Sequence, residues 1–132
     1  HNQRGDAVLK EDVRRYRQAW RDAGNPGDPS VSIRITTHVS ATKEEATSFA
    51  ESLEQVRRER AAASGATDRG HSEQGSNNML GTAEEVVERV HQLEEDFGAD
   101  EILCDMMNYS LPRESVLQSM RLLSDRVIPK VK

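Results

Sequence analysis

The stretch GTAEEVVERVHQLEEDFGADEILC, residues 81–104, decides the fold of this chain. It opens with a capping box, in which Thr82 and Glu85 each satisfy a backbone N–H of the first helical turn. The apolar side chains that follow recur at helical spacing and form one stripe, Val86, Val90, Leu93 and Phe97. Gly98 stands where a left-handed residue ends a helix, and Ile102-Leu103-Cys104 is too short for another helix. The stretch therefore predicts a capped amphipathic helix followed by a short buried strand, which is half of a β-α-β unit.

The segments before this stretch alternate in the same way. Residues 7–23 carry apolar side chains at helical spacing, which predicts a first helix. Residues 31–39, VSIRITTHV, form the one clear long strand because they are rich in β-branched side chains. A second capping box, Thr42 with Glu45, then opens another helix. Strand and helix alternation of this kind is typical of a parallel α/β sheet.

Residues 61–79 interrupt the alternation. They hold glycines and small polar side chains and almost no apolar anchor, so their composition cannot offset the entropy lost on ordering. We expect a mobile loop here, ending in a very short strand at Met79-Leu80. After Cys104 a last amphipathic helix is predicted, and we expect Pro129 to end it.

Bulk composition limits the function classes. The chain has 132 residues, of which 35% are hydrophobic and 4% aromatic, both low for a chain that buries a core of its own. Its net charge of −5 provides no basic field for nucleic acid or an anionic membrane, and no apolar run approaches the length of a membrane span. The single cysteine, Cys104, excludes an internal disulfide and a cysteine-based zinc site, and we read it as a small buried residue. These properties suit a reducing cytosol, and no metal site is predicted.

Two segments carry a resemblance to a known family. GTAEEVVERVHQLEEDFGADEIL, with SMRLLSDRVIPKV behind it (residues 119–131), resembles the C-terminal end of the luciferase-like flavin-dependent monooxygenases. Ala83 departs from the proline that is usual after Gly-Thr in that family. The resemblance implies a (β/α)8 TIM-type barrel that uses FMN or the deazaflavin F420. Because such a barrel needs roughly 250 residues, residues 1–132 are expected to be one partial domain, the C-terminal β/α units of a barrel with a long loop.

Arg34 and His38 are the candidate catalytic residues. Alternation along residues 31–39 places them on one face of the strand, and His38 lies nearer the carboxyl end, where barrel enzymes build their active sites. The alternative is an edge strand with one face in solvent, and the residues themselves favour neither interpretation.

Four further residues are candidates for cofactor binding. In the luciferase-like family a mobile insertion closes over the flavin, so the resemblance makes Arg69 and His71 candidate lid residues. A disordered connector is the simpler alternative. Gly81 and Thr82 stand at a strand-to-helix junction whose free N–H groups can hold a phosphate, although any helix start has this pattern.

The resemblance implies a reduced flavin that reacts with oxygen, or an F420-type hydride transfer, with a small organic substrate. The remainder of the barrel or an equivalent chain is then the expected partner, since most flavin contacts of the family lie in earlier strands. Two alternatives stay open, a non-catalytic half-barrel that binds flavin or a partner, and an unrelated small α/β interaction domain. The substrate, the choice between FMN and F420, and a homo-oligomeric state cannot be read from the sequence.

Overall fold

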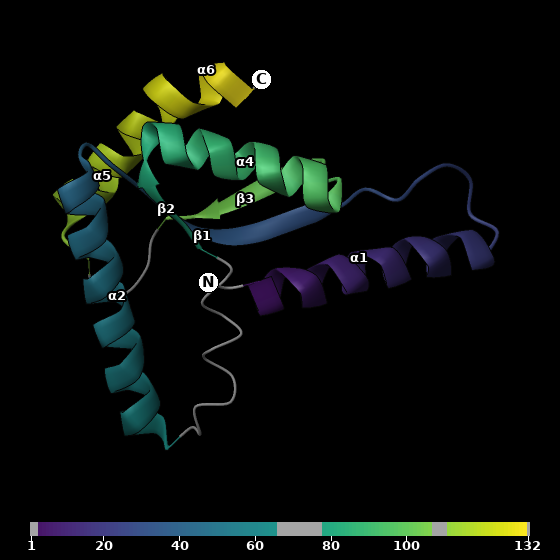
Figure 1. Cartoon of the computed structure of the whole chain (residues 1–132), viewed down its shortest axis with the longest axis horizontal. Coiled ribbons are helices and arrows are strands. Elements are labelled where there is room, and N and C mark those ends of the chain that lie inside the picture. The colour runs from purple at the N-terminus through teal and green to yellow at the C-terminus, as the bar shows by residue number, and fades with distance from the viewer. Residues whose placement is uncertain (1–2, 66–77, 107–110, 132) are drawn as a thin grey trace.

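The computed structural model describes residues 3–65, 78–106 and 111–131. The elements follow in the order α1 (Gln3–Asp22), β1 (Ser32–Ser40), α2 (Lys43–Ser64), β2 (Asn78–Thr82), α4 (Ala83–Phe97), β3 (Glu101–Asp105), α5 (Arg113–Leu122), the π-helical turn η2 (Leu123–Val127) and α6 (Ile128–Val131) (Figure 1). The α5, η2 and α6 segments follow one another directly and form one helical run. The alternation of helices and strands that the sequence predicts is confirmed.

The three strands form one parallel sheet in the order β2-β1-β3. The central strand β1 pairs with β2 through its second half, from Thr36 opposite Asn78 to Ser40 opposite Thr82. Its first half pairs with β3, from Ser32 opposite Glu101 to Thr36 opposite Asp105. Both β2 and β3 therefore pair with β1 and not with each other.

The core lies on one face of this sheet. Alternate side chains of β1 are buried there, Ile33, Ile35, Thr37 and Val39, together with Val31 just before the strand. They meet the apolar stripe of α4, and Val127 of η2 packs into the same cluster. Helix α5 is also linked to the sheet, because Oγ of Ser119 accepts a hydrogen bond of 2.8 Å from the backbone N–H of Val39. In Figure 1, α4 and the C-terminal helical run accordingly cover the same face of the sheet.

The opposite face of β1 is covered only near its carboxyl end. There the His38 ring stacks on Phe49 of α2, and Ser40 is also buried. Ser32 and Arg34, in the first half of the strand, are exposed. Helix α2 thus lies on the face opposite α4, and its far end extends away from the sheet (Figure 1).

Helix α1 packs against α4. Val13 joins the core cluster, and the guanidinium group of Arg17 donates to the carbonyl oxygens of Phe97 and Gly98 at 3.0 and 3.1 Å. A second link joins Arg89 of α4 to Asp6 through two hydrogen bonds of 3.1 Å. These contacts place α1 along α4 from its middle to its C-terminal end.

The deciding stretch forms the predicted elements. Thr82 is the N-cap of α4, and its hydroxyl accepts from the backbone N–H of Glu85 at 3.4 Å. Gly98 has φ 58°, the left-handed conformation, and its N–H donates to the carbonyl of Glu94 at 2.8 Å. A residue with a side chain is strained at such a φ, which explains the glycine.

Three expectations need correction. Cys104 is exposed, because β3 lies at an edge of the sheet. Pro129 does not end the last helix, which continues to Val131. The π-helical turn Leu123–Val127 precedes it, and this wider turn leaves room for the proline ring, which clashes with the preceding turn of a regular α-helix. The loop predicted over residues 61–79 differs at both ends, since α2 continues to Ser64 and β2 begins at Asn78. Residues 66–77 lie outside the described residues.

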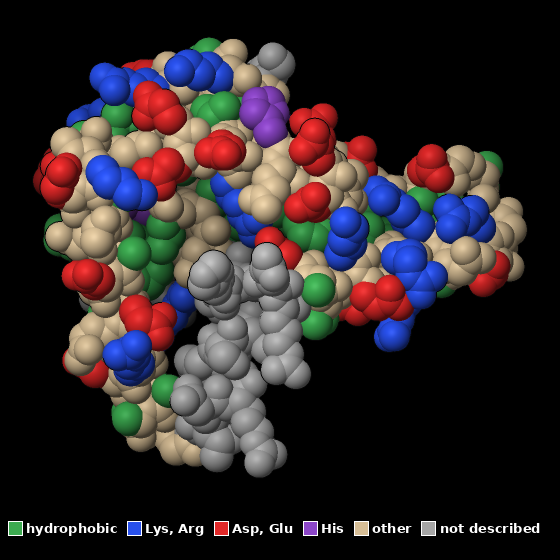
Figure 2. All heavy atoms as spheres, viewed as in Figure 1, with side chains coloured by type: hydrophobic (Ala, Val, Ile, Leu, Met, Phe, Trp, Pro, Cys, Tyr) green, Lys and Arg blue, Asp and Glu red, His purple; other side chains and the backbone are tan. Residues whose placement is uncertain are grey.

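Within the described ranges, no helix has the length and apolar character needed to cross a membrane. Acidic and basic side chains are interspersed over the face shown in Figure 2, including along α1. Part of this mixture is local pairing, as in the hydrogen bond of 2.7 Å from Arg14 to Glu11 one helical turn away.

Candidate functional site

His38 lies near the carboxyl end of the central strand, opposite Leu80 of β2. Only 6% of the residue is exposed. Its ring is stacked on Phe49, with ring centroids 3.7 Å apart and an angle of 6° between the planes. Among the residues that the structure describes, the buried Nδ1 atom has no hydrogen-bond partner. A buried polar atom in this state is uncommon and calls for an explanation.

Burial lowers the pKa of His38 below its usual value of 6.5, and the nearby carboxylate of Glu45 opposes this shift only in part. The imidazole is therefore neutral at pH 7. A neutral imidazole has one nitrogen that donates a hydrogen bond and one that accepts. His38 can consequently hydrogen-bond to either kind of polar group brought against Nδ1, depending on its tautomer.

Arg34 lies on the same face of β1 as His38 but not beside it. Four residues along a strand separate them by roughly 13 Å. The Arg34 guanidinium instead donates to Asp105 of β3 at 2.7 Å, and its own side chain is 76% exposed. The structure thus does not bring the two predicted catalytic residues together, and Arg34 links β1 to β3.

Gly81 and Thr82 do lie at the N-terminus of α4, as predicted. Carboxylates already surround this helix end. Lys43 of α2 donates to Glu85 at 2.9 Å, and a hydrogen bond to its own backbone N–H lowers the pKa of Glu84. Gly81 packs directly on Glu85, where an added Cβ would lie 2.9 Å from Oε2. The cations Lys43, Arg126 and Lys130 lie near these carboxylates and offset part of their charge. A phosphate contact at Gly81 and Thr82 stays a prediction.

The other two predicted cofactor residues, Arg69 and His71, lie outside the described residues. Their assignment to a lid stays a prediction.

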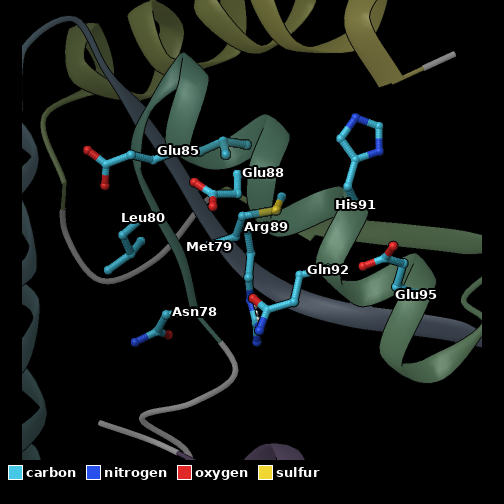
Figure 3. Close-up of a pocket in the computed structure, with 10 residues that line it drawn as sticks. Asn78, Met79, Leu80, Glu85, Glu88, Arg89, His91, Gln92 and Glu95 are labelled. Carbon is cyan, nitrogen blue, oxygen red and sulfur yellow. Dashed lines mark hydrogen bonds between the residues drawn. The ribbon is translucent and has the colours of Figure 1, made fainter.

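A polar pocket of about 620 Å³ lies between β2 and α4 (Figure 3). Sequence reasoning did not identify it. Three carboxylates line it, Glu85, Glu88 and Glu95. Arg89 also lines it, but this guanidinium donates to Asp6 and to Gln92, the latter at 2.9 Å. The pocket is therefore mainly acidic, and a flavin phosphate is a poor match for it. In the sequence, only the spacing of the glutamates along α4 could have indicated this pocket, and a helix face in solvent has the same pattern.

An apolar groove of about 470 Å³ lies beyond the other side of α4. Val90 of α4, Ile102 and Cys104 of β3, and Ile128 and Val131 of α6 contribute to its lining. On the opposite face of β3, Leu103 is 49% exposed. The edge strand β3 is thus incompletely covered on both faces.

No family model matches the sequence, and no curated protein matches it significantly. Solved structures do match. Monooxygenase RslO1 from Streptomyces bottropensis has a TM-score of 0.76 and 20% sequence identity, over 99% of this chain and 40% of that one. The oxygenating constituent of 3,6-diketocamphane monooxygenase from Pseudomonas putida, a type II Baeyer-Villiger enzyme solved in complex with FMN, has a TM-score of 0.64 and 23% identity. That match covers 97% of this chain and 41% of the enzyme.

At these identities the likeness concerns the fold. The chain spans about two-fifths of the length of both enzymes. The structural comparison therefore confirms the resemblance to luciferase-like flavin monooxygenases that residues 81–104 indicate, and over nearly its whole length the chain has a fold similar to part of these enzymes.

Proposed function

We propose that this chain is the C-terminal part of a flavin-dependent monooxygenase that acts on a small organic substrate, with FMN as the first candidate cofactor and F420 as the second. The proposal rests on the environment of His38. It combines a buried, unpaired Nδ1 with a position near the carboxyl end of a parallel strand, where α/β barrels bind their ligands, in a fold similar to that of two monooxygenases.

The residues around His38 fit a flavin ring better than a flavin phosphate. An uncharged imidazole with an unpaired nitrogen can hydrogen-bond to the polar edge of the ring system or to a substrate carbonyl. Gly81 and Thr82 stay the candidates for the phosphate, where carboxylates and cations lie together. A bound reduced flavin would supply the reaction with oxygen. The role of this chain would be to orient the ring through His38 and to exclude water near it.

The rest of the barrel is the expected partner. An eight-stranded barrel closes only when each strand has neighbours on both edges, and here β2 and β3 each have one neighbour among the described strands. An eight-stranded barrel would need five strands in addition to the three described strands. Most of the substrate pocket would then be built from those units, together with the open polar face around Arg34.

The test is a flavin titration of the purified chain and of the longest polypeptide that contains it. We expect the chain to quench FMN fluorescence on binding. His38→Ala should weaken the FMN affinity roughly tenfold or more, because a buried hydrogen bond to the ligand is lost. His91→Ala is the matched control, since His91 is an exposed residue of α4. Because free reduced FMN consumes oxygen by itself, catalysis is then tested by the transfer of an atom of labelled oxygen to an added small organic substrate in the presence of reduced FMN. Equal FMN affinity in both variants, or no binding of either flavin, would contradict the proposal.

A second candidate is a non-catalytic half-barrel that recruits a partner through its sheet edge. The exposed Leu103 and the apolar groove beside β3 favour this reading, because such surfaces mark contacts between proteins. The two candidates differ in catalysis. A polypeptide that binds flavin or a partner but transfers no oxygen atom to a substrate in the presence of reduced FMN supports the second.

A further inference from the structure

We propose that Phe49 occupies the place of a planar aromatic ligand on the His38 imidazole, and that a ligand ring binds at His38 by displacing the Phe49 side chain. The inference rests on the proposed function for the identity of the ring, an isoalloxazine. The geometry itself points to any planar aromatic ligand.

The stacking geometry is the first support. The rings lie nearly parallel, 6° from coplanar, with centroids only 3.7 Å apart. Aromatic side chains prefer offset or edge-to-face contacts with centroids about 4.5–7 Å apart, because direct superposition brings like regions of the two quadrupoles together. Tyr16 and Trp20 of α1 show the preferred kind of contact, at 6.5 Å and 67°. The His38–Phe49 pair thus covers the imidazole without the favourable geometry of a lasting aromatic pair.

The unpaired nitrogen is the second support. Phe49 excludes water from His38 but has no polar atom to offer, so Nδ1 is left without a partner in the described part of the chain. A heteroaromatic ligand has polar atoms at its ring edge and could supply the missing hydrogen bond while keeping the imidazole covered. Replacing phenylalanine by such a ring improves the contact in both respects.

The attachment of α2 is the third support. Its buried residues are Ala46 and Leu53, whereas the shorter α4 buries Ala83, Val86, Leu93 and Phe97. Phe49 is itself only half-buried. The start of α2 is fixed, because Lys43 is paired with Glu85 and the carboxylate of Glu45 accepts from the N–H of Ala41 at 3.2 Å. Displacement therefore needs a rotation of the Phe49 side chain or a shift of the helix beyond it, and not detachment of α2.

Lumiflavin is the probe of choice, because it carries the flavin ring without ribityl or phosphate groups. Binding to the purified chain is measured by fluorescence, and the His38 ring resonances are followed by NMR. Phe49→Ala should bind lumiflavin roughly three- to tenfold more tightly than the unchanged chain, since the site is no longer closed by a competing side chain. Leu53→Ala is the control. It also truncates a buried side chain of α2 but leaves the His38–Phe49 stack in place, so no tightening is expected.

Phe49→Leu provides a second variant that keeps apolar bulk without the ring, in case Phe49→Ala fails to fold. Tighter binding in these variants, with shifted His38 resonances, supports the proposal. Lumiflavin affinity that is unchanged or weaker in both would overturn it, while FMN binding that depends on His38 would leave the proposed function standing. Failure of every variant to bind lumiflavin and FMN would contradict both.

Discussion

At the scale of single residues, the fold buries the His38 ring and thereby lowers its pKa. Its ring is buried against Phe49 on a sheet face that is otherwise open and polar. Sequence alternation places the residue on this face, but it carries no information about which helix covers it. The unpaired Nδ1 follows from Phe49, which was recognisable in the sequence only as part of an apolar helical stripe.

Stability should depend on pH through His38. Its pKa in the folded chain lies below the 6.5 of an exposed histidine, so between these two values the unfolded state binds a proton that the folded state does not. The free energy of unfolding should therefore fall as the pH drops below about 6.5 and level off below the lowered pKa. Urea denaturation at several pH values measures this. His38→Gln should flatten the fall and His91→Gln should not; parallel curves for His38→Gln and the unchanged chain would contradict the assignment.

At the scale of single elements, α4 is the part of the fold that could be predicted best. Its N-cap Thr82 and C-cap Gly98 are both local signals, and both occur in the structure. Elements whose exposure depends on distant neighbours were predicted less well. Ile102-Leu103-Cys104 is apolar on both faces and suggests an interior strand, whereas β3 is an edge strand with Cys104 exposed. A proline usually ends a helix, and no local pattern in the sequence indicates the π-helical turn that precedes Pro129.

The end of α4 gives a stability prediction at this scale. Gly98 and Gly65 both have left-handed φ, 58° and 64°, but only at Gly98 would a Cβ collide with the Arg17 guanidinium. Gly65→Ala should cost about 1 kcal/mol for the backbone alone, and Gly98→Ala about 2 kcal/mol or more, because the Arg17 contacts to α4 are also disturbed. Urea denaturation of the two variants compares them. Equal losses would mean that Arg17 contributes nothing to holding α1 against α4.

At the scale of the whole molecule, strand order is the feature that the sequence did not reveal. Hydrophobic alternation specifies which face of a strand is buried, but not which strand lies at which edge. In a closed (β/α)8 barrel each strand lies between its predecessor and its successor. Here β1 lies between β2 and β3, and α2 and α4 are on opposite faces of the sheet. The helices of such a barrel form an outer ring, so they all lie on the same face of the strands. If the chain forms part of a complete barrel, β3 must therefore leave β1 and pair with β2. Helix α2 must also move to the face that α4 covers, which separates Phe49 from His38.

Disulfide trapping can detect this rearrangement. Arg34 and Leu103 are register partners on the open face of the β1–β3 pair and both are exposed. Arg34→Cys with Leu103→Cys, in a Cys104→Ser background, should oxidise readily in the 132-residue chain, because neighbouring strands are within disulfide reach. Within a complete barrel the same pair should stay reduced. The single variants control for intermolecular bonds. Crosslinking in both forms would show that β3 remains on β1, and the barrel proposal would then fail.

Native mass spectrometry of the polypeptide purified from the cells that make it is the most direct test that the chain is part of a flavin enzyme, because it reports the chain mass and any bound flavin together. We expect a polypeptide well above the 14.8 kDa of this chain, since the chain spans about two-fifths of the similar enzymes, with a mass increment of FMN or F420 that is lost on denaturation. A polypeptide of 14.8 kDa without a flavin increment would contradict it.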